Sequence, residues 1–187
     1  MGFVLKSSIK RLGNFMTMYD QDRLNKIVSE AHSRVSDSYF TSVFLSHSHH
    51  DTDLIFPIVV LLRGYGIDVY VDWMDETMSK VPTGETAQKL KTKIQVNNKF
   101  LFLATNSALS SKWCNWEIGY GDAYKYIDDI AVFPILSDGK WEGQEYLQIY
   151  PSVKLRGVYN EYHLGPNNFY VEYPNGDSIS LKEWIKQ

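Results

Sequence analysis

Short apolar runs alternate with segments of helical periodicity from Ser42 onward. The apolar runs are residues 42–45, 67–71, 99–104 and 130–136, and the helical segments between them are residues 53–63, 86–96 and 111–126. This alternation is typical of a parallel sheet with helices packed against it. The runs are almost entirely apolar, as expected when helices cover both faces of the sheet. The sequence therefore predicts a doubly wound α/β fold.

Weaker patterns flank this region. After an irregular start, apolar residues at three- and four-residue spacing predict one amphipathic N-terminal helix: Leu24, Ile27, Val28, Ala31 and Val35. Toward the other end, FYVEY, the turn PNGD and SIS predict a hairpin, and LKEWIKQ a short terminal helix. We therefore expect a helical extension over residues 1–41 and a main domain over residues 42–187 that includes the hairpin and the terminal helix.

Composition and charge narrow the class of protein. The chain has 19 basic and 22 acidic residues, and no basic stripe that would bind a nucleic-acid backbone. Cys114 is the only cysteine, so an intramolecular disulfide is excluded, which fits a reducing compartment. The longest apolar run, around residues 54–62, is too short to span a bilayer. We expect a cytoplasmic protein that binds neither nucleic acid nor membrane.

The segment around Glu117 is the most informative for chemistry. Helical spacing places several aromatic residues on the same face as this carboxylate: Trp113, Trp116, Tyr120 and Tyr124. No cation lies three or four positions from Glu117, so its own helix offers no ion pair. An unpaired carboxylate beside apolar side chains is costly and is typical of functional sites. A surface glutamate and an ordinary core tryptophan at Trp113 remain the alternatives.

The loops after the strands are the expected ligand-binding positions, because ligands of doubly wound sheets bind beyond the carboxyl ends of the strands. The first of these loops contains His47, His49 and His50. They could suggest a metal site, but no cysteine or repeated histidine pair completes a ligand set. We expect solvated loop histidines and no metal.

Three segments, in the right order and at the right separations, resemble a known family. They are SVFLSHSHHD, then VYVDWMD followed by PTGETAQKL, then FLFLATNSALSSKWCNWE. Together they are similar to the conserved boxes of bacterial TIR (Toll/interleukin-1 receptor-like) domains, and the resemblance covers roughly residues 42–136. It implies a flavodoxin-like sheet.

The resemblance also implies an activity, the cleavage of the nicotinamide–ribose bond of NAD+. It makes Glu117 the catalytic carboxylate and Trp113 the ring that stacks on a base. It places further residues near the dinucleotide: Ser46, His47 and Ser48 in the first loop, and Asp72 near the nicotinamide ribose. No cofactor beyond NAD+ as substrate is implied.

The biological role follows from the same resemblance. TIR proteins similar to this chain belong to anti-phage systems such as Thoeris, which implies an ADP-ribose-derived signal and a separate effector protein that responds to it. The sequence does not fix the group that attacks the ribose, which is an adenine nitrogen, a ribose hydroxyl, a small nucleophile or water. The resemblance to TIR enzymes of this kind also implies that the protein self-associates through the loop of residues 73–85.

Two other functions remain possible on the sequence. The first is a non-catalytic TIR–TIR interaction module that uses the same loop. The second is a nucleoside deoxyribosyltransferase-like enzyme, a related α/β fold that also places a glutamate at a ribose carbon.

Overall fold

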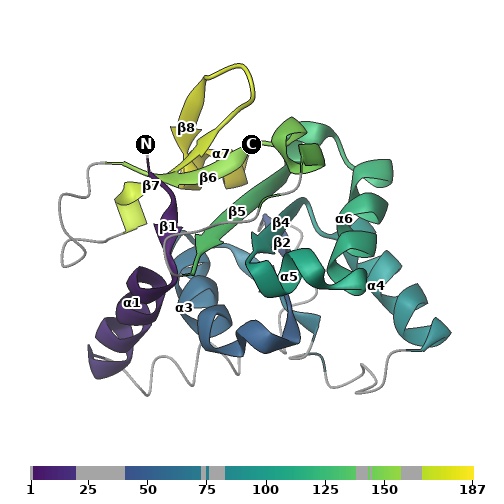
Figure 1. Cartoon of the computed structure of the whole chain (residues 1–187), viewed down its shortest axis with the longest axis horizontal. Helices are drawn as coiled ribbons and strands as arrows, with labels where there is room; N and C mark the ends of the chain where they lie inside the picture. The colour runs from purple at the N-terminus through teal and green to yellow at the C-terminus, as the bar shows by residue number, and fades with distance from the viewer. Residues whose placement is uncertain are drawn as a thin grey trace.

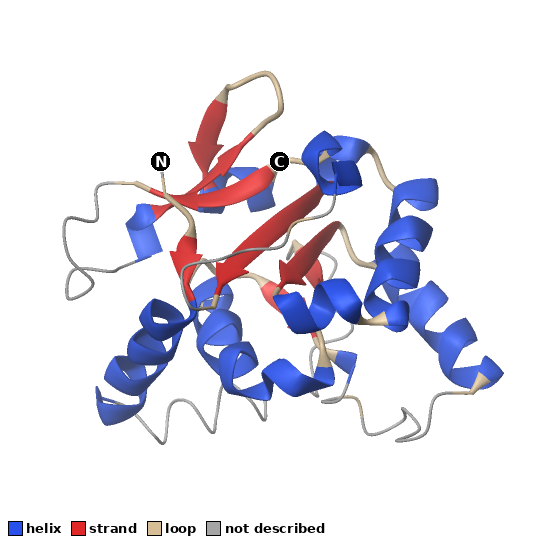
Figure 2. Ribbon diagram, in the orientation of Figure 1, coloured by secondary structure: helices blue, strands red, loops and turns tan. Residues whose placement is uncertain are grey.

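The computed structural model describes residues 2–19, 41–72, 75, 83–137, 143, 145–156 and 166–187. A twisted sheet runs through the middle of the molecule with helices on either side (Figures 1 and 2). Its strand order is β3-β2-β4-β5-β6-β7-β8, and β1 pairs beside β5. The strands are β1 Val4–Leu5, β2 Ser42–Ser46, β3 Asp68–Tyr70, β4 Lys99–Ala104, β5 Ile130–Leu136, β6 Ser152–Leu155, β7 Phe169–Glu172 and β8 Ser178–Ser180.

The first part of the sheet is parallel and the last two strands are antiparallel. Strands β1 to β6 pair in parallel, whereas β7 and β8 form an antiparallel hairpin on β6. The helices are α1 Lys6–Tyr19, α3 Thr52–Arg63, α4 Gly84–Val96, α5 Asn106–Ser110, α6 Lys112–Tyr124 and α7 Leu181–Lys186. Short 3-10 turns are η1 His49–Asp51, η3 Ile127–Asp129, η4 Glu145–Ile149 and η6 Pro166–Asn168.

Alternate residues of the central strands point to opposite faces of the sheet and pack into two separate hydrophobic cores. On β4, Leu101 and Leu103 pack in a cluster with residues of α1, α3 and α7. Phe100 and Phe102 point to the other face and pack with residues of α4, α5 and α6. Because each face of the sheet has its own layer of helices, the predicted doubly wound α/β fold is confirmed.

The N-terminal segment departs from the expectation. Residues 4–19 form a strand and a helix, so the expected irregular start is wrong. Val4 pairs with Ile135 of β5, and Val4 and Ile9 are fully buried. A two-residue strand is too short to show a periodicity, which is why the sequence did not predict it. The helix expected around residues 24–35 lies outside the described residues, and the boundary at residue 41 stays a prediction.

The C-terminal hairpin and helix are as expected. The turn contains Gly176 at φ +92°, a left-handed conformation that glycine adopts without strain. Helix α7 begins with a capping box, in which Ser180 and Glu183 satisfy each other's backbone N–H groups. Trp184 is fully buried, and its Nε1 donates to the Asp128 carbonyl at 2.8 Å. The strand β6 next to the hairpin was not predicted.

Among the described residues, no helix combines the length and the apolar character that crossing a bilayer requires.

Helices α1 and α3 meet at a glycine. A Cβ built on Gly13 would lie 2.5 Å from Cγ of Pro57, which is closer than real atoms approach. A proline ring cannot rotate away as a long side chain can. The docking of α1 on α3 therefore depends on the absence of a side chain at position 13.

We predict that Gly13→Ala lowers the free energy of unfolding by about 1 to 2 kcal/mol, because overpacking outweighs the gain in helix propensity. Gly119→Ala in α6 is the matched control. Nothing lies within 4 Å of its added Cβ, so only the propensity gain of about 0.5 to 1 kcal/mol remains. Thermal and urea unfolding of both variants measure the difference. Equal stabilisation by the two substitutions would contradict the close α1–α3 contact.

Candidate active site

The carboxyl ends of the parallel strands bring the predicted site residues to one edge of the sheet. Ser46 is the last residue of β2, His47 and Ser48 follow it, and Asp72 lies just after β3. Ser46, His47 and Ser48 are all buried. Glu117 approaches this edge from α6, where it too is buried, at 5% exposure. The structure therefore brings five of the six predicted site residues into one region.

Helix α6 holds Glu117 against the sheet. The helix begins at Lys112 and is capped by Ser111, whose Oγ accepts a hydrogen bond from the Cys114 backbone N–H at 3.3 Å. In its last turn, Gly121 lies so close to the Phe100 ring that a Cβ there would be 3.1 Å from the ring. This close approach directs the buried side of α6, which includes Glu117, toward the strands.

Glu117 forms a buried hydrogen bond with the end of β2. Ser46 Oγ donates to Glu117 Oε2 at 2.6 Å. Burial raises the pKa of Glu117 from 4.5 to about 8; the Ser46 hydrogen bond opposes this shift, and the charge of Asp72 adds to it. The side chain is thus largely a neutral carboxylic acid at pH 7. A cation placed beside it would favour the charged form.

The aromatic residues of α6 stack mainly on one another. Trp113 meets Trp116 edge to face at 5.5 Å, Trp116 stacks on Tyr120 at 5.7 Å, and Tyr120 lies 4.7 Å from Tyr124. Glu117 belongs instead to the buried side and bonds to β2. The expectation that this carboxylate shares a face with the aromatic residues stays a prediction. A shared binding pocket for Trp113 and Glu117 stays a prediction.

His47 differs from the expected solvated histidine. It is buried, its Nδ1 lies 3.1 Å from the Leu45 carbonyl, and its Nε2 lies 3.6 Å from Asp72 Oδ1. Burial lowers the pKa of His47 below its ordinary value, although the charge of Asp72 opposes this. His49 and His50 are exposed, as expected. Within the described ranges, no three histidine, cysteine or carboxylate side chains form a group that could hold a metal.

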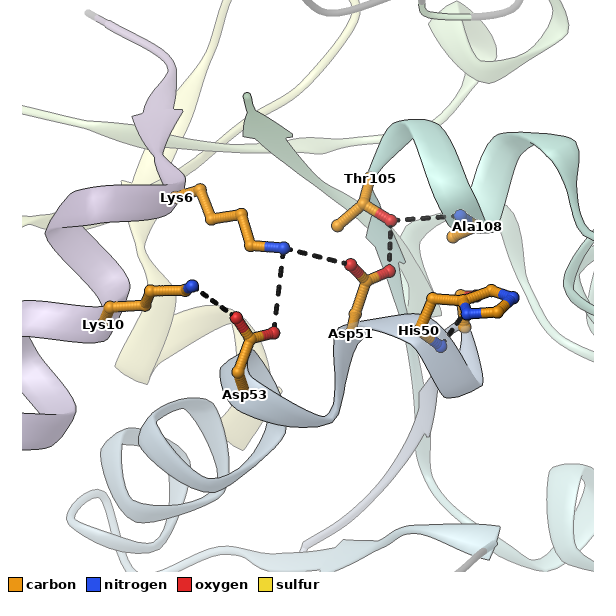
Figure 3. A network of polar contacts seen from close by, with 8 residues as sticks. Lys6, Lys10, His50, Asp51, Asp53, Thr105 and Ala108 are labelled. Atoms are coloured by element: carbon orange, nitrogen blue, oxygen red, sulfur yellow. Dashed lines mark hydrogen bonds and ion pairs between the residues drawn. The ribbon is translucent and has the colours of Figure 1, made fainter. Parts of the chain in front are cut away.

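A polar network that the sequence did not reveal supports the same loop (Figure 3). Asp51, only 1% exposed, accepts a hydrogen bond from the Thr105 hydroxyl at the end of β4. Thr105 Oγ1 also accepts from the Ala108 N–H at 3.0 Å and so caps α5. Asp51 ends the quoted motif SVFLSHSHHD, but its partner is 54 residues away. Only the folded chain pairs the two.

The N-terminal helix reaches this network through two lysines. Lys6 Nζ lies 3.6 Å from Asp51 and 3.7 Å from Asp53, and Lys10 Nζ lies 2.6 Å from Asp53. Figure 3 shows both lysines extending from α1 toward the start of α3. These ion pairs join the N-terminal segment to the loop that carries Ser46 and His47.

The loop of residues 73–85 is described only at Asp75 and at Thr83 to Glu85. The Tyr70 hydroxyl donates to Asp75 Oδ2 at 3.0 Å, and Lys93 of α4 pairs with the same carboxylate at 3.3 Å. The rest of this loop, on which the expected self-association depends, lies outside the described residues.

A family model described as TIR domain matches residues 43–164. The chain belongs to the TIR domain family. Along nearly its full length this TIR protein is similar to a probable 3′ cyclic ADP-D-ribose synthase, ThsB′, of Bacillus cereus (strain MSX-D12). The two are 27% identical over 98% of this chain and 95% of that protein.

A second relative is a putative cyclic ADP-D-ribose synthase, TIR2, of Cytobacillus dafuensis. It is 28% identical over 57% of this TIR protein, and the match spans 27% of that longer protein.

We predict that Glu117→Gln removes a pH dependence from the stability. Because the folded-state pKa is raised to about 8, the stability that the protonated Glu117 provides is complete below pH 4.5 and is lost as pH rises through about 8. The glutamine variant should match wild type near pH 5 and exceed it at pH 9 by about 2 to 5 kcal/mol.

Denaturant unfolding between pH 5 and pH 9 measures this difference. Glu145→Gln, at an exposed carboxylate, is the control and should follow the wild-type curve. A Glu117→Gln curve parallel to wild type across the range would show that the carboxyl is not buried as described.

Proposed function

We propose that this TIR domain protein cleaves the nicotinamide–ribose bond of NAD+ and forms a cyclic ADP-ribose, with Glu117 as its catalytic carboxylate. The observation that carries the proposal is the buried Glu117, held by Ser46 at the carboxyl ends of the strands. The similarity to two relatives named as a probable and a putative cyclic ADP-D-ribose synthase supports the same reaction.

The chemistry suits a site with one such carboxylate. A glycosidase commonly protonates a poor leaving group, which requires a second carboxyl group. Nicotinamide leaves NAD+ as a neutral molecule, so no acid is needed, and the remaining requirement is to stabilise positive charge that develops on the ribose. A buried carboxylate does this strongly, because little water screens it.

The substrate itself would ionise this carboxylate. Glu117 is largely protonated in the unliganded protein because it is buried. The nicotinamide ring of NAD+ carries a positive charge, and an opposite charge within a few ångströms lowers the pKa of a carboxyl group. Binding of NAD+ would therefore create the charge that its cleavage requires.

The other predicted residues have supporting roles in this proposal. Ser46 orients Glu117, Asp72 lies near the nicotinamide ribose, and Trp113 stacks on a base. His47 and Ser48 border the dinucleotide in the loop after β2. A module that only docked onto other TIR domains would have no need for a buried carboxylate bonded to a strand end.

The product would act as a messenger in anti-phage defence, where a separate effector protein responds to it. The Bacillus cereus relative is named as a probable 3′ cyclic ADP-D-ribose synthase, which supports capture of the ribosyl cation by a hydroxyl of the same molecule. A closed site favours such capture, because it keeps water away from the reactive cation.

We predict that purified protein, alone or activated by infected-cell extract, releases nicotinamide from NAD+ and that Glu117→Gln slows this release by on the order of 100-fold or more. Chromatography with mass spectrometry identifies the products, and circular dichroism confirms that the variant is folded. Glu145→Gln serves as the control and should retain full activity. A folded Glu117→Gln variant that works at the wild-type rate would refute the catalytic assignment.

We also propose that neighbouring subunits complete the site through the loop of residues 73–85. Specific activity should then rise with protein concentration, because association precedes catalysis. A dilution series, with light scattering on the same samples, measures both quantities. Constant specific activity of a monomer over the whole series would contradict a shared site.

A further inference from the structure

The two ring nitrogens of His47 differ, because one forms a hydrogen bond and the other forms none within the described residues. Nδ1 lies 3.1 Å from the Leu45 carbonyl. A carbonyl oxygen can only accept, so Nδ1 carries the proton of this hydrogen bond. Nε2 is buried and forms no hydrogen bond within the described part of the chain. In the neutral ring, Nε2 is therefore an acceptor that no hydrogen bond from these residues satisfies.

The surroundings of the ring keep it neutral near pH 7. Burial lowers its pKa, the charges of Asp72 and Asp51 act in the opposite direction, and His49 adds to the lowering. Nε2 lies 3.6 Å from Asp72 Oδ1, beyond hydrogen-bond length. Neutral Nε2 and the Asp72 carboxylate are both hydrogen-bond acceptors. A ligand group that donates a proton, such as a hydroxyl, could therefore bind to either of them.

His47 belongs to the same region as Glu117. It directly follows Ser46, whose hydroxyl binds the Glu117 carboxyl. The His47 carbonyl also accepts a hydrogen bond from Cys114 Sγ at 3.2 Å, and Cys114 lies one helical turn before Glu117. A ribose held against Glu117 would therefore be close to the loop that carries the His47 ring.

The nature of the attacking group decides whether a base is needed. An adenine nitrogen attacks with a lone pair and has no proton to lose. A ribose hydroxyl must give up its proton as its oxygen forms the new bond. In a site closed to water this proton needs an acceptor within hydrogen-bond reach.

We propose that His47 Nε2 is the general base that takes the proton from the ribose hydroxyl that closes the ring; this proposal rests on the proposed function. The bond between nicotinamide and ribose C1 breaks, and its electron pair leaves on the nicotinamide nitrogen. The hydroxyl oxygen then bonds to C1 while its proton moves to Nε2. The products are a cyclic ADP-ribose, nicotinamide and one proton, which later passes to solvent.

The neighbouring carboxyl groups are suited to other tasks. Glu117 must keep its negative charge to stabilise the ribosyl cation, and protonation would remove it. The Asp72 side chain is 22% exposed, against 1% for that of His47. Once Nε2 is protonated, Asp72 is placed to pair with the charged ring, which stabilises the protonated base.

Two substitutions at His47 separate proton transfer from hydrogen bonding. Glutamine places an acceptor near the position of Nε2 but takes no proton at neutral pH, and His47→Ala removes both properties. The exposed His50→Gln is the matched control. Each enzyme is given NAD+, under the conditions that activate wild type, and nicotinamide, cyclic product and linear ADP-ribose are quantified between pH 5 and pH 9.

We expect the ratio of cyclic to linear product to fall on the order of 100-fold in both His47 variants, the usual effect of losing a general base. Nicotinamide release should change far less, because breaking that bond moves no proton. In wild type the ratio should rise with pH through the lowered pKa of His47 and then level off. An unchanged ratio in folded His47→Gln would overturn the proposal while leaving NAD+ cleavage established.

A second measurement does not require turnover. In protein labelled with 15N-histidine, NMR should show His47 with Nδ1 protonated and Nε2 unprotonated at pH 7, its signals being identified by their loss in His47→Gln. Added ADP-ribose, which has free ribose hydroxyls, should shift the Nε2 signal, whereas nicotinamide should not. A protonated Nε2, or an Nε2 signal that ADP-ribose leaves unchanged, would overturn the proposal. Absence of nicotinamide release from wild type would instead refute the proposed function.

Discussion

The hydrogen bond from Ser46 Oγ to Glu117 Oε2 is the interaction on which the site depends, because it joins the end of β2 to the helix α6. A buried carboxyl without a partner would be strongly destabilising. Satisfying it requires α6 to lie close to the sheet, which Gly121 permits by packing directly on the Phe100 ring. The same closeness that forms the bond excludes water and sets the protonation of the carboxyl.

A second set of contacts fixes the loop that provides Ser46. Asp51 is held by Thr105 on one side and by Lys6 of α1 on the other. Ends of two strands and the N-terminal helix therefore meet at one buried carboxylate. The N-terminal segment therefore helps to hold the site in place. It does so through the Lys6–Asp51 ion pair and through the packing of Gly13 on α3.

The sequence predicted the features that depend on neighbouring residues and missed those that depend on contacts between residues far apart in the chain. Strands β2, β4 and β5 and helices α3, α4 and α6 were predicted because long apolar runs and helical periodicity are local properties. Glu117 was found because its own helix lacked a cation. Its partner Ser46 is 71 residues away, and the burial of His47 and Asp51 depends on packing that no local pattern encodes. Strand β1 was missed because two residues show no periodicity and its partner β5 lies far along the chain. Strand β6 was missed because only its Val153 is buried, so it has no apolar run.

The pairing of β1 with β5 has a consequence for folding during synthesis. Val4 is synthesised well before its partner Ile135, which is made only after β2, β3 and β4. Until then Val4, which ends fully buried, lacks the strand that pairs with it. Contacts between such distant parts of a chain form slowly, and uncovered apolar segments favour aggregation. The apolar segment around Val4 therefore stays without its pairing strand until most of the parallel sheet has been synthesised.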